Sequence, residues 1–358
     1  MSGGQLLIYG ANGYTGRLVI REALEKGLRP ILSGRNAVEL DALGAEHGLQ
    51  VRVAALDDDR ALDGVLAGCG VVIHCAGPFS RTARPMAEAC MRTGTHYLDI
   101  TGEISVFEGM AALSKEAAAK GVMLMPGAGF DVVPSDCLAA FLKEQLPTAT
   151  TLTLAFVGGS GLSRGTATTM TENIAEGGAV RRGGKIVRVP SAWRERDIDF
   201  GDKVRHTVTI PWGDVSTAWH STRIPDIEVY TGVPRSTARA MKMTRYLGWL
   251  LATAPVQRWL KARIRSGAPG PSDAQRSTAQ SRLWGEVRDA EGRVVQARLL
   301  APDGYTLTAR TAVAAAQKVL AGTFKPGFQT PSRAFGSGFI LEIPGCTREI
   351  VPVVERSA

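Results

Sequence analysis

The chain has 358 residues, of which 44% are hydrophobic and 21% are charged, so it is long enough for two domains and too apolar for a disordered protein. Lysine and arginine outnumber aspartate and glutamate by 42 to 34, which gives a formal net charge of +8. We interpret this excess first as scattered surface arginines, although it also suits an anionic ligand, a nucleic acid or an acidic membrane.

The first 145 residues alternate between short apolar strands and helices. The expected strands cover 5–10, 29–33, 51–57, 70–78, 96–100 and 122–127. The expected helices cover 14–26, 36–47, 59–67, 82–93, 106–120 and 132–145. Because such strands are apolar almost throughout, they predict a parallel sheet covered on both faces, in an α/β fold of the Rossmann-type, doubly wound kind.

The pattern changes after residue 150 and predicts a second, α+β domain built on a mixed or antiparallel sheet. Alternating apolar and polar residues indicate strands, a hairpin turns near Glu291 and Gly292, and 266–277 has the composition of a loop. The expected strand segments are 149–159, 203–212, 223–233 and 281–302, and the expected helices are 237–264 and 305–322. We predict a dinucleotide-binding domain over 1–130, completed by about 305–358, and a substrate and dimerisation domain over 131–304.

Three glycines lie between the first expected strand and the first expected helix. In this context the first glycine permits a tight turn, the second lets the backbone approach a pyrophosphate, and the third lets the helix pack on the strand. The phosphates then face free N–H groups at the positive end of the helix. The residues assigned to this loop are Gly10, Asn12, Gly13, Tyr14, Thr15 and Gly16.

The end of the second strand predicts which dinucleotide binds. NAD sites usually carry a carboxylate there for the ribose hydroxyls, whereas this chain has Ser33 and Arg35. A guanidinium is suited to the additional phosphate of NADP, and the Ser33 hydroxyl can add a donor. We therefore expect NADP(H) in preference to NAD(H), with Asp57 near the adenine edge.

Ligands of such sheets lie at the carboxyl ends of the strands. The fourth strand ends in a Gly-Pro turn, which we expect to line the nicotinamide ribose. Its residues are Cys75, Ala76, Gly77, Pro78 and Phe79. The fifth and sixth strands deliver the candidate catalytic side chains, which are Tyr97, Asp99, Glu103 and Asp131. For the three carboxylates, a helix cap or a salt bridge is an equally good interpretation.

The sequence gives no indication of a metal site, a nucleic-acid-binding module or a signal peptide. The five histidines lack metal-ligand spacing, so no metal is expected, and no nucleic-acid-binding module is recognisable. The five cysteines form no CxxC pair, and a strand begins almost at once, without a signal peptide. We therefore expect a cytoplasmic protein that acts on a small molecule.

The segment 238–265 combines tryptophan, leucine and methionine with many cations. One interpretation is a peripheral contact with an anionic membrane or a lipid-like substrate. The other is an amphipathic helix pair packed on the second domain or at a dimer interface. We favour the second, because Pro255 interrupts the helix.

Motifs along the whole chain resemble a known family. They are GANGYTG (10–16), SGR (33–35), CAGPFS (75–80), GTHYLDITGE (94–103), PGAGFDVVPSD (126–136), GPSDAQRS (270–277), LWGEVRD (283–289), DGYTLTA (303–309) and FQTPSRAFG (328–336). Together they resemble the saccharopine dehydrogenase-like oxidoreductases, and within them the branch of trans-acting enoyl reductases. The resemblance covers nearly the whole chain and implies NADP(H) and a homodimer formed through the middle domain.

The resemblance leads to one hypothesis and two alternatives. The hypothesis is an NADP(H)-dependent oxidoreductase that transfers a hydride to an enoyl-type C=C bond of a hydrophobic, polyketide-like or lipid-like substrate. The first alternative is a C=N reductase or dehydrogenase for an amino-acid-derived imine, which two clustered arginines in the second domain would favour. The second alternative is an NADP(H)-binding sensor or scaffold without turnover.

Overall fold

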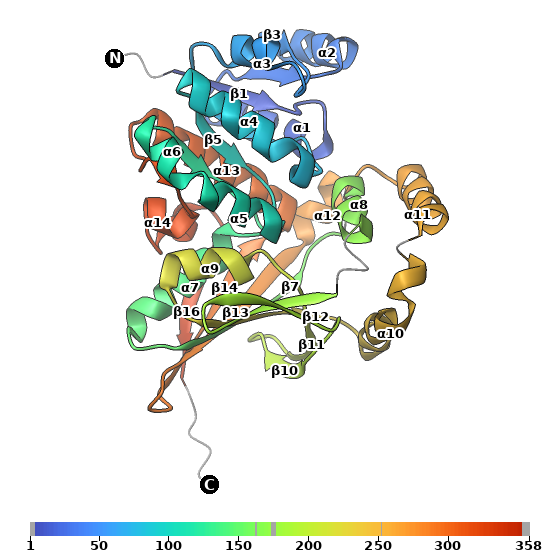
Figure 1. Ribbon diagram of the computed structural model, residues 1–358, viewed down its shortest axis with the longest axis vertical. Coiled ribbons are helices and arrows are strands. Elements are labelled where there is room, and N and C mark those ends of the chain that lie inside the picture. The colour runs from blue at the N-terminus through green and yellow to red at the C-terminus, as the bar shows by residue number, and fades with distance from the viewer. Residues whose placement is uncertain (1–3, 162, 173–176, 252, 353–358) are drawn as a thin grey trace. The chain divides into compact units, whose positions relative to one another are not determined.

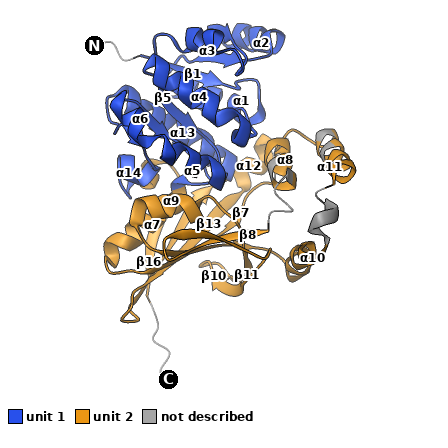
Figure 2. Ribbon diagram, viewed as in Figure 1, with its two compact units in different colours: residues 1–133, 304–339 blue, residues 134–303, 340–358 orange. Residues whose placement is uncertain are grey.

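The computed structural model describes residues 4–161, 163–172, 177–251 and 253–352. The chain forms two compact units, shown in Figure 2. Unit 1 contains residues 1–133 and 304–339, and unit 2 contains residues 134–303 and 340–358. The expected first domain included all of 305–358. The structure instead groups 340–358 with unit 2, because a strand over 347–351 pairs with the second strand of the predicted hairpin.

Unit 1 is built on a seven-stranded sheet in the order β15-β6-β5-β4-β1-β2-β3 (Figure 1). The strands are β1 (Gln5–Tyr9), β2 (Ile31–Gly34), β3 (Val51–Val53), β4 (Cys69–His74), β5 (His96–Asp99), β6 (Met123–Met125) and β15 (Gly327–Phe328). Every neighbouring pair is parallel. The strand order reverses direction between β1 and β4, which is the switch point of a Rossmann-type sheet and confirms the predicted fold class.

Helices cover both faces of this sheet (Figure 1). They are α1 (Tyr14–Glu25), α2 (Ala37–His47), α3 (Asp59–Leu66), α4 (Phe79–Thr93), α5 (Ile104–Ala112), α6 (Ser114–Ala119), α13 (Gly304–Leu320) and the short α14 (Pro331–Phe335). Helices α3 to α6 share one buried core with Leu7, Val72, Tyr97 and Leu124 of the strands. Helix α1 packs against α13, so the C-terminal part of the chain completes this unit.

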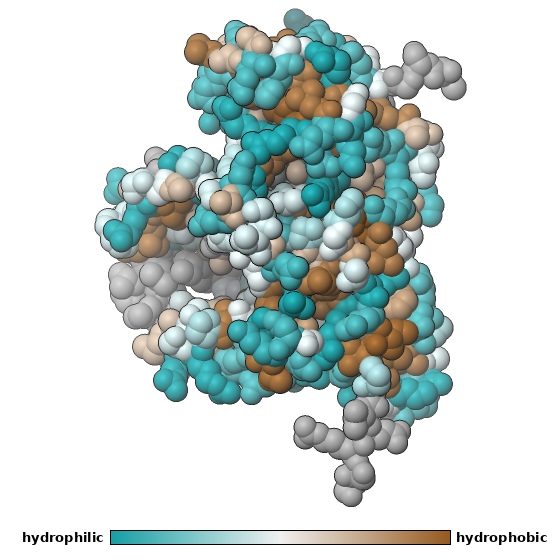
Figure 3. Space-filling model, turned by 180° about the vertical axis from the view of Figure 1, so that it is seen from behind, coloured by the Kyte–Doolittle hydropathy of each residue, from teal (hydrophilic) through white to brown (hydrophobic). Residues whose placement is uncertain are grey.

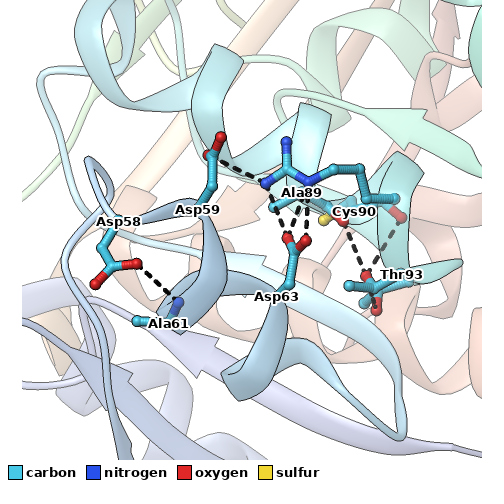
Figure 4. Close-up of polar contacts among 9 residues, drawn as sticks. Asp58, Asp59, Ala61, Asp63, Ala89, Cys90 and Thr93 are labelled. Carbon is cyan, nitrogen blue, oxygen red and sulfur yellow. Dashed lines mark hydrogen bonds and ion pairs between the residues drawn. The ribbon is translucent and has the colours of Figure 1, made fainter.

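An ion-pair network joins α3 to α4 in unit 1 (Figure 4). Arg92 donates to both oxygens of Asp63, from Nε to Oδ2 at 2.9 Å and from Nη2 to Oδ1 at 2.8 Å, and also to Asp59 at 3.1 Å. Asp58 caps α3 by accepting from the Ala61 amide at 3.0 Å. These carboxylates therefore fix the helices that follow β3 and β4 and are not a metal cluster.

Unit 2 is built on a mixed sheet whose main path is β10-β11-β12-β7-β13-β14-β16, with β8 and β9 attached at β12. The strands are β7 (Thr151–Gly158), β8 (Gly178–Arg182), β9 (Lys185–Val189), β10 (Glu195–Asp199), β11 (Val204–Thr209), β12 (Asp226–Gly232), β13 (Gln280–Arg288), β14 (Val294–Pro302) and β16 (Thr347–Val351). Among the strands that the structure describes here, β7 and β12 pair in parallel and the other pairs are antiparallel, as expected for a mixed sheet.

The helices of unit 2 include some that the sequence pattern did not predict. They are α7 (Val133–Gln145), α8 (Arg164–Glu172), α9 (Asp214–Thr222), α10 (Arg235–Leu251), α11 (Ala254–Ser266), α12 (Asp273–Thr278) and the 3-10 helix η1 (Phe339–Glu342). The segment expected as a loop contains α12, because Ser272 and Gln275 form a reciprocal capping box. No helix among the described residues combines the length and the apolar character needed to cross a membrane.

Candidate functional site

The glycine loop after β1 has no room for side chains at two positions. Gly10 has φ of +78°, and a Cβ there would lie 2.8 Å from the backbone nitrogen of Ala76. A Cβ on Gly16 would lie 2.4 Å from the Gly10 carbonyl oxygen. The loop therefore depends on glycine for its left-handed turn and for close packing of α1 on β1 and of β1 on the segment after β4.

The N-terminus of α1 has no side-chain cap. Gly13 is the exposed N-cap, and the first turn of the helix carries no carboxylate. The neighbouring side chains are held away, since the Asn12 amide donates to Glu39 at 2.7 Å and the Tyr14 ring packs edge-on against Tyr305. Thr15 is partly buried. Backbone N–H groups and the helix dipole thus form a cradle for phosphate.

Arg35 follows β2 as an exposed side chain that has no hydrogen bond or ion pair among the described residues. Both Arg35 and the exposed Asp57 lie near the Tyr9 hydroxyl. Burial is the main cause that raises the pKa of this hydroxyl to about 12, while Arg35 lowers the pKa and Asp57 raises it. Ser33 differs from the expectation. Its hydroxyl is fully buried without a partner, so the residue serves the loop through its carbonyl, which accepts from Gly10 at 2.8 Å.

The segment after β4 joins the glycine loop to α4. Cys75 donates its amide to the Tyr9 carbonyl at 2.8 Å, and burial raises the pKa of its thiol to about 12, so the thiol stays neutral. Ala76 faces Gly10, and its carbonyl accepts from Thr82 at 2.7 Å. The Gly77–Pro78 peptide is cis, Gly77 is exposed, and Phe79 begins α4. The structure therefore brings this predicted turn directly against the glycine loop.

Glu103 is a helix cap in the structure. Its two carboxylate oxygens accept from the amides of Phe79 at 2.9 Å and of Ser80 at 3.1 Å, at the N-terminus of α4. The carboxylate thereby accepts from two backbone N–H groups that have no carbonyl partner within the helix. Its negative charge also lies at the positive end of the helix.

We expect Glu103→Ala to lower the free energy of unfolding by about 1–2 kcal/mol, because the α4 cap is lost. Urea unfolding followed by circular dichroism measures the change. Glu88→Ala is the matched control, since Glu88 lies on the same helix but only forms an exposed pair with Arg84. We expect that control to change stability by less than about 0.5 kcal/mol. Equal losses in the two variants would contradict the capping role.

Tyr97 and Asp99 form a buried pair at the end of β5. The Tyr97 hydroxyl donates to Asp99 Oδ2 at 2.6 Å, and the amides of Thr101 and Gly127 donate to Oδ1 at 2.9 and 2.8 Å. Burial raises the pKa of Asp99 to about 6, although these hydrogen bonds oppose the rise. Both side chains are fully buried, so the pair joins the loops after β5 and β6 and does not offer a surface to a ligand.

Asp131 lies in the loop after β6 and is the most perturbed carboxyl of the predicted set. It is partly buried, and a Cβ on Gly102 would lie 2.7 Å from its Oδ2. Removal of water by the surrounding protein raises the pKa of Asp131 from 3.8 to about 7. At neutral pH this side chain can therefore either donate or accept a proton.

The pattern of the sequence did not reveal the residues that support this loop. Two threonines of α13 bind this loop. The Thr308 hydroxyl accepts from the Phe130 amide at 3.0 Å, and the Thr311 hydroxyl donates to the Ala128 carbonyl at 2.8 Å. His74 is fully buried among aromatic rings, and neither ring nitrogen has a partner. Burial lowers the pKa of His74 to about 3, so its imidazole is neutral. Nothing in the sequence distinguished this histidine from an ordinary core residue.

The fold and the site of unit 1 define a dinucleotide-binding domain. Residues 6–125 match the family model described as the saccharopine dehydrogenase NADP binding domain. This part of the chain is therefore similar to the NADP-binding domains of saccharopine dehydrogenases. The residues fit that cofactor, because the glycine loop provides the phosphate cradle and Arg35 is an unpaired cation after β2.

Two curated relatives are similar in sequence over part of the chain. The trans-acting enoyl reductase of Mycobacterium leprae (strain TN) is 34% identical over 139 residues, which are 37% of this chain and 33% of that protein. The saccharopine dehydrogenase-like oxidoreductase of Mus musculus is 27% identical over 163 residues, which are 39% of this chain and 38% of that protein. The chain thus spans about a third of the length of these relatives.

Among solved structures, the following is similar over both units. The apo saccharopine dehydrogenase (L-Glu forming) of Saccharomyces cerevisiae aligns with a TM-score of 0.67 at 15% identity. The alignment covers 98% of this chain and 100% of that one. At this identity the likeness shows the fold, namely a Rossmann-type unit followed by a mixed-sheet unit.

Proposed function

We propose that the protein is an NADP(H)-dependent oxidoreductase that reduces a conjugated, enoyl-type C=C bond of a hydrophobic small molecule. The observation that supports it most is the combination, in one unit, of an NADP-binding glycine loop with a carboxyl group whose pKa is near neutrality. The name of the similar mycobacterial relative favours this choice of bond. Preference for NADP(H) over NAD(H) follows from the unpaired Arg35.

The chain's own residues divide the work of such a reaction. When bound, the nicotinamide supplies the hydride. The N-terminus of α1 holds the diphosphate, and Arg35 holds the additional phosphate of the adenosine ribose. The Tyr97–Asp99 pair fixes the loops after β5 and β6. Asp131, in its protonated form, gives a proton to the carbon next to the one that receives the hydride.

The C=N alternative rests on one feature of unit 2. A hollow of about 310 Å³ is lined by Arg282, Arg298 and Arg348, which is the kind of arginine cluster that an amino-acid adduct requires. However, Arg298 pairs with Asp199 at 2.8 Å and Arg282 lies 3.5 Å from Asp202, so their charges are already compensated. We therefore rank imine reduction second. The non-catalytic sensor, the homodimer and the cytoplasmic location stay predictions.

The test is consumption of NADPH by the purified protein with two sets of substrates. One set contains long-chain α,β-unsaturated thioesters and ketones, and the other pairs amino acids with 2-oxo acids. We expect turnover with the first set. Turnover with the second set alone would establish the imine alternative. Cofactor binding without turnover in either set would favour the sensor.

A further inference from the structure

The positive charge of the chain is concentrated in one segment. Lysine and arginine exceed aspartate and glutamate by eight over the whole sequence. The stretch 229–272 contains eight cations and not one carboxylate, so the remaining residues carry equal numbers of both. This stretch includes α10 and α11 of unit 2, and α11 lies beside α8 (Figure 1). The excess is therefore a local surface property and not a scatter of arginines.

Helix α10 presents an apolar and basic stripe to solvent. Arg239, Met243 and Tyr246 follow one another at spacings of four and three residues, so they lie on one face of the helix. Tyr246 is 73% exposed and Met243 is 54% exposed. The opposite face is anchored, because Met241 packs against a small core that contains Val208 of β11.

Helix α11 repeats this arrangement. Trp259 is 62% exposed, and Arg258 and Arg263 are exposed on the same side of the helix. The other side is tied to α8, since the Gln257 amide donates to the Thr171 carbonyl at 3.0 Å. An exposed tryptophan between two exposed arginines is therefore a fixed feature of the unit 2 surface.

Three exposed arginines of the two helices form no ion pair among the described residues. Two others do have partners, since Arg235 pairs with Asp197 and Arg245 donates to the Ser191 and Ala192 carbonyls. Arg239 and Arg263 have no side-chain hydrogen bond or ion pair among the described residues, and Arg258 reaches only a carbonyl of its own turn. By contrast, Lys242, which points toward β10, pairs with Glu195 at 2.7 Å. Single exposed apolar residues are common on the surface, as Figure 3 shows, and need no explanation. Exposed apolar residues flanked by arginines that form no ion pair do need an explanation.

We propose that α10 and α11 bind the surface of a bilayer rich in anionic phospholipid, which goes beyond the proposed reaction. Tryptophan, tyrosine and methionine enter the interface between headgroups and acyl chains, while arginines pair with phosphates. A second copy of the chain is a poor occupant, because two surfaces with this excess of positive charge repel. The sequence pattern favoured an amphipathic helix pair packed on the second domain or at a dimer interface. Both helices do pack on unit 2, and Tyr246 and Trp259 are exposed on the single chain.

The test is sedimentation of the full-length protein with vesicles. Vesicles of phosphatidylcholine alone are compared with vesicles that also contain phosphatidylglycerol, at low and high salt. The first variant combines Arg239→Ala, Arg258→Ala and Arg263→Ala. Each arginine near an anionic leaflet contributes about a fivefold gain in partition, so we expect a loss of about 100-fold. The control combines Arg60→Ala, Lys115→Ala and Lys185→Ala, three exposed cations elsewhere, and we expect less than about a threefold loss.

A second variant tests entry into the interface. Tyr246→Ala with Trp259→Ala leaves the charge unchanged, and we expect about a tenfold loss of partition and no binding at high salt. The proposal is overturned if the native protein ignores anionic vesicles, if the control triple loses as much as the first, or if the aromatic pair is without effect. Tighter binding to duplex DNA than to vesicles would also overturn it. Unchanged thermal unfolding shows that the variants are folded.

Discussion

Gly10→Ala is expected to weaken NADPH binding about 100-fold or more and to destabilise unit 1. The new Cβ would lie 2.8 Å from the Ala76 nitrogen and 2.9 Å from the Ala76 Cβ, so the loop or the segment after β4 must move. A displacement of about 1 Å in such a cradle is enough for an effect of this size. Titration calorimetry measures the affinity, and urea unfolding measures the accompanying loss of stability.

Gly27→Ala is the matched control for that variant. Gly27 has φ of +75°, almost the same as the +78° of Gly10, but a Cβ there meets nothing within 4 Å. Both variants therefore share the strain of a left-handed alanine, about 1–2 kcal/mol, and only Gly10→Ala adds the clash. Unchanged NADPH affinity in Gly10→Ala, or an equal loss in Gly27→Ala, would contradict the role of the loop.

Asp131→Asn is expected to lower the rate of reduction by about 10²–10⁴-fold, because the proton donor is lost. In the native protein the rate is expected to be constant at low pH and to fall tenfold per pH unit above about 7, as the Asp131 carboxyl ionises. Asp41→Asn makes the same chemical change at an exposed carboxylate of α2 and should leave the profile intact. A native profile that is flat through pH 7 would contradict this assignment.

The pH dependence of stability gives a second measurement of the Asp131 pKa, and it needs no substrate. Because the folded pKa is raised from 3.8 to about 7, the folded chain holds a proton that the unfolded chain releases. This contribution to stability is complete below pH 4 and is lost as the pH rises through 7. Asp131→Asn should therefore be more stable than the native protein at pH 8, by on the order of 3 kcal/mol, and the difference should shrink at lower pH.

The sequence predicts the Rossmann-type unit well because its signals are local. Apolar strands alternating with helices set six of the seven strands, and the glycine spacing marks the first turn. The seventh strand, β15, has only two residues and forms because Gly327 and Phe328 pair with β6. A strand of that length has no periodicity to detect. The same applies to β16, whose exposed residues depend on pairing with β14.

The sequence predicts a position for the candidate site but not the role of each side chain. Strand order predicts that ligands lie at the carboxyl ends of β4, β5 and β6. However, Asp99, Glu103 and Asp131 are equivalent in a sequence. Their roles diverge through long-range contacts, because Asp99 is held by amides of two loops, Glu103 caps α4, and burial raises the pKa of Asp131.

Binding of nicotinamide nucleotides to the native protein and to Arg35→Ala tests the central claim most directly. Titration calorimetry should show NADPH binding at least tenfold more tightly than NADH, since a charge-assisted hydrogen bond to the additional phosphate contributes about 1.5–3 kcal/mol. In Arg35→Ala the two affinities should become nearly equal while NADH binding is unchanged. Absence of heat with every nicotinamide nucleotide, or equal affinities in the native protein, would contradict the account.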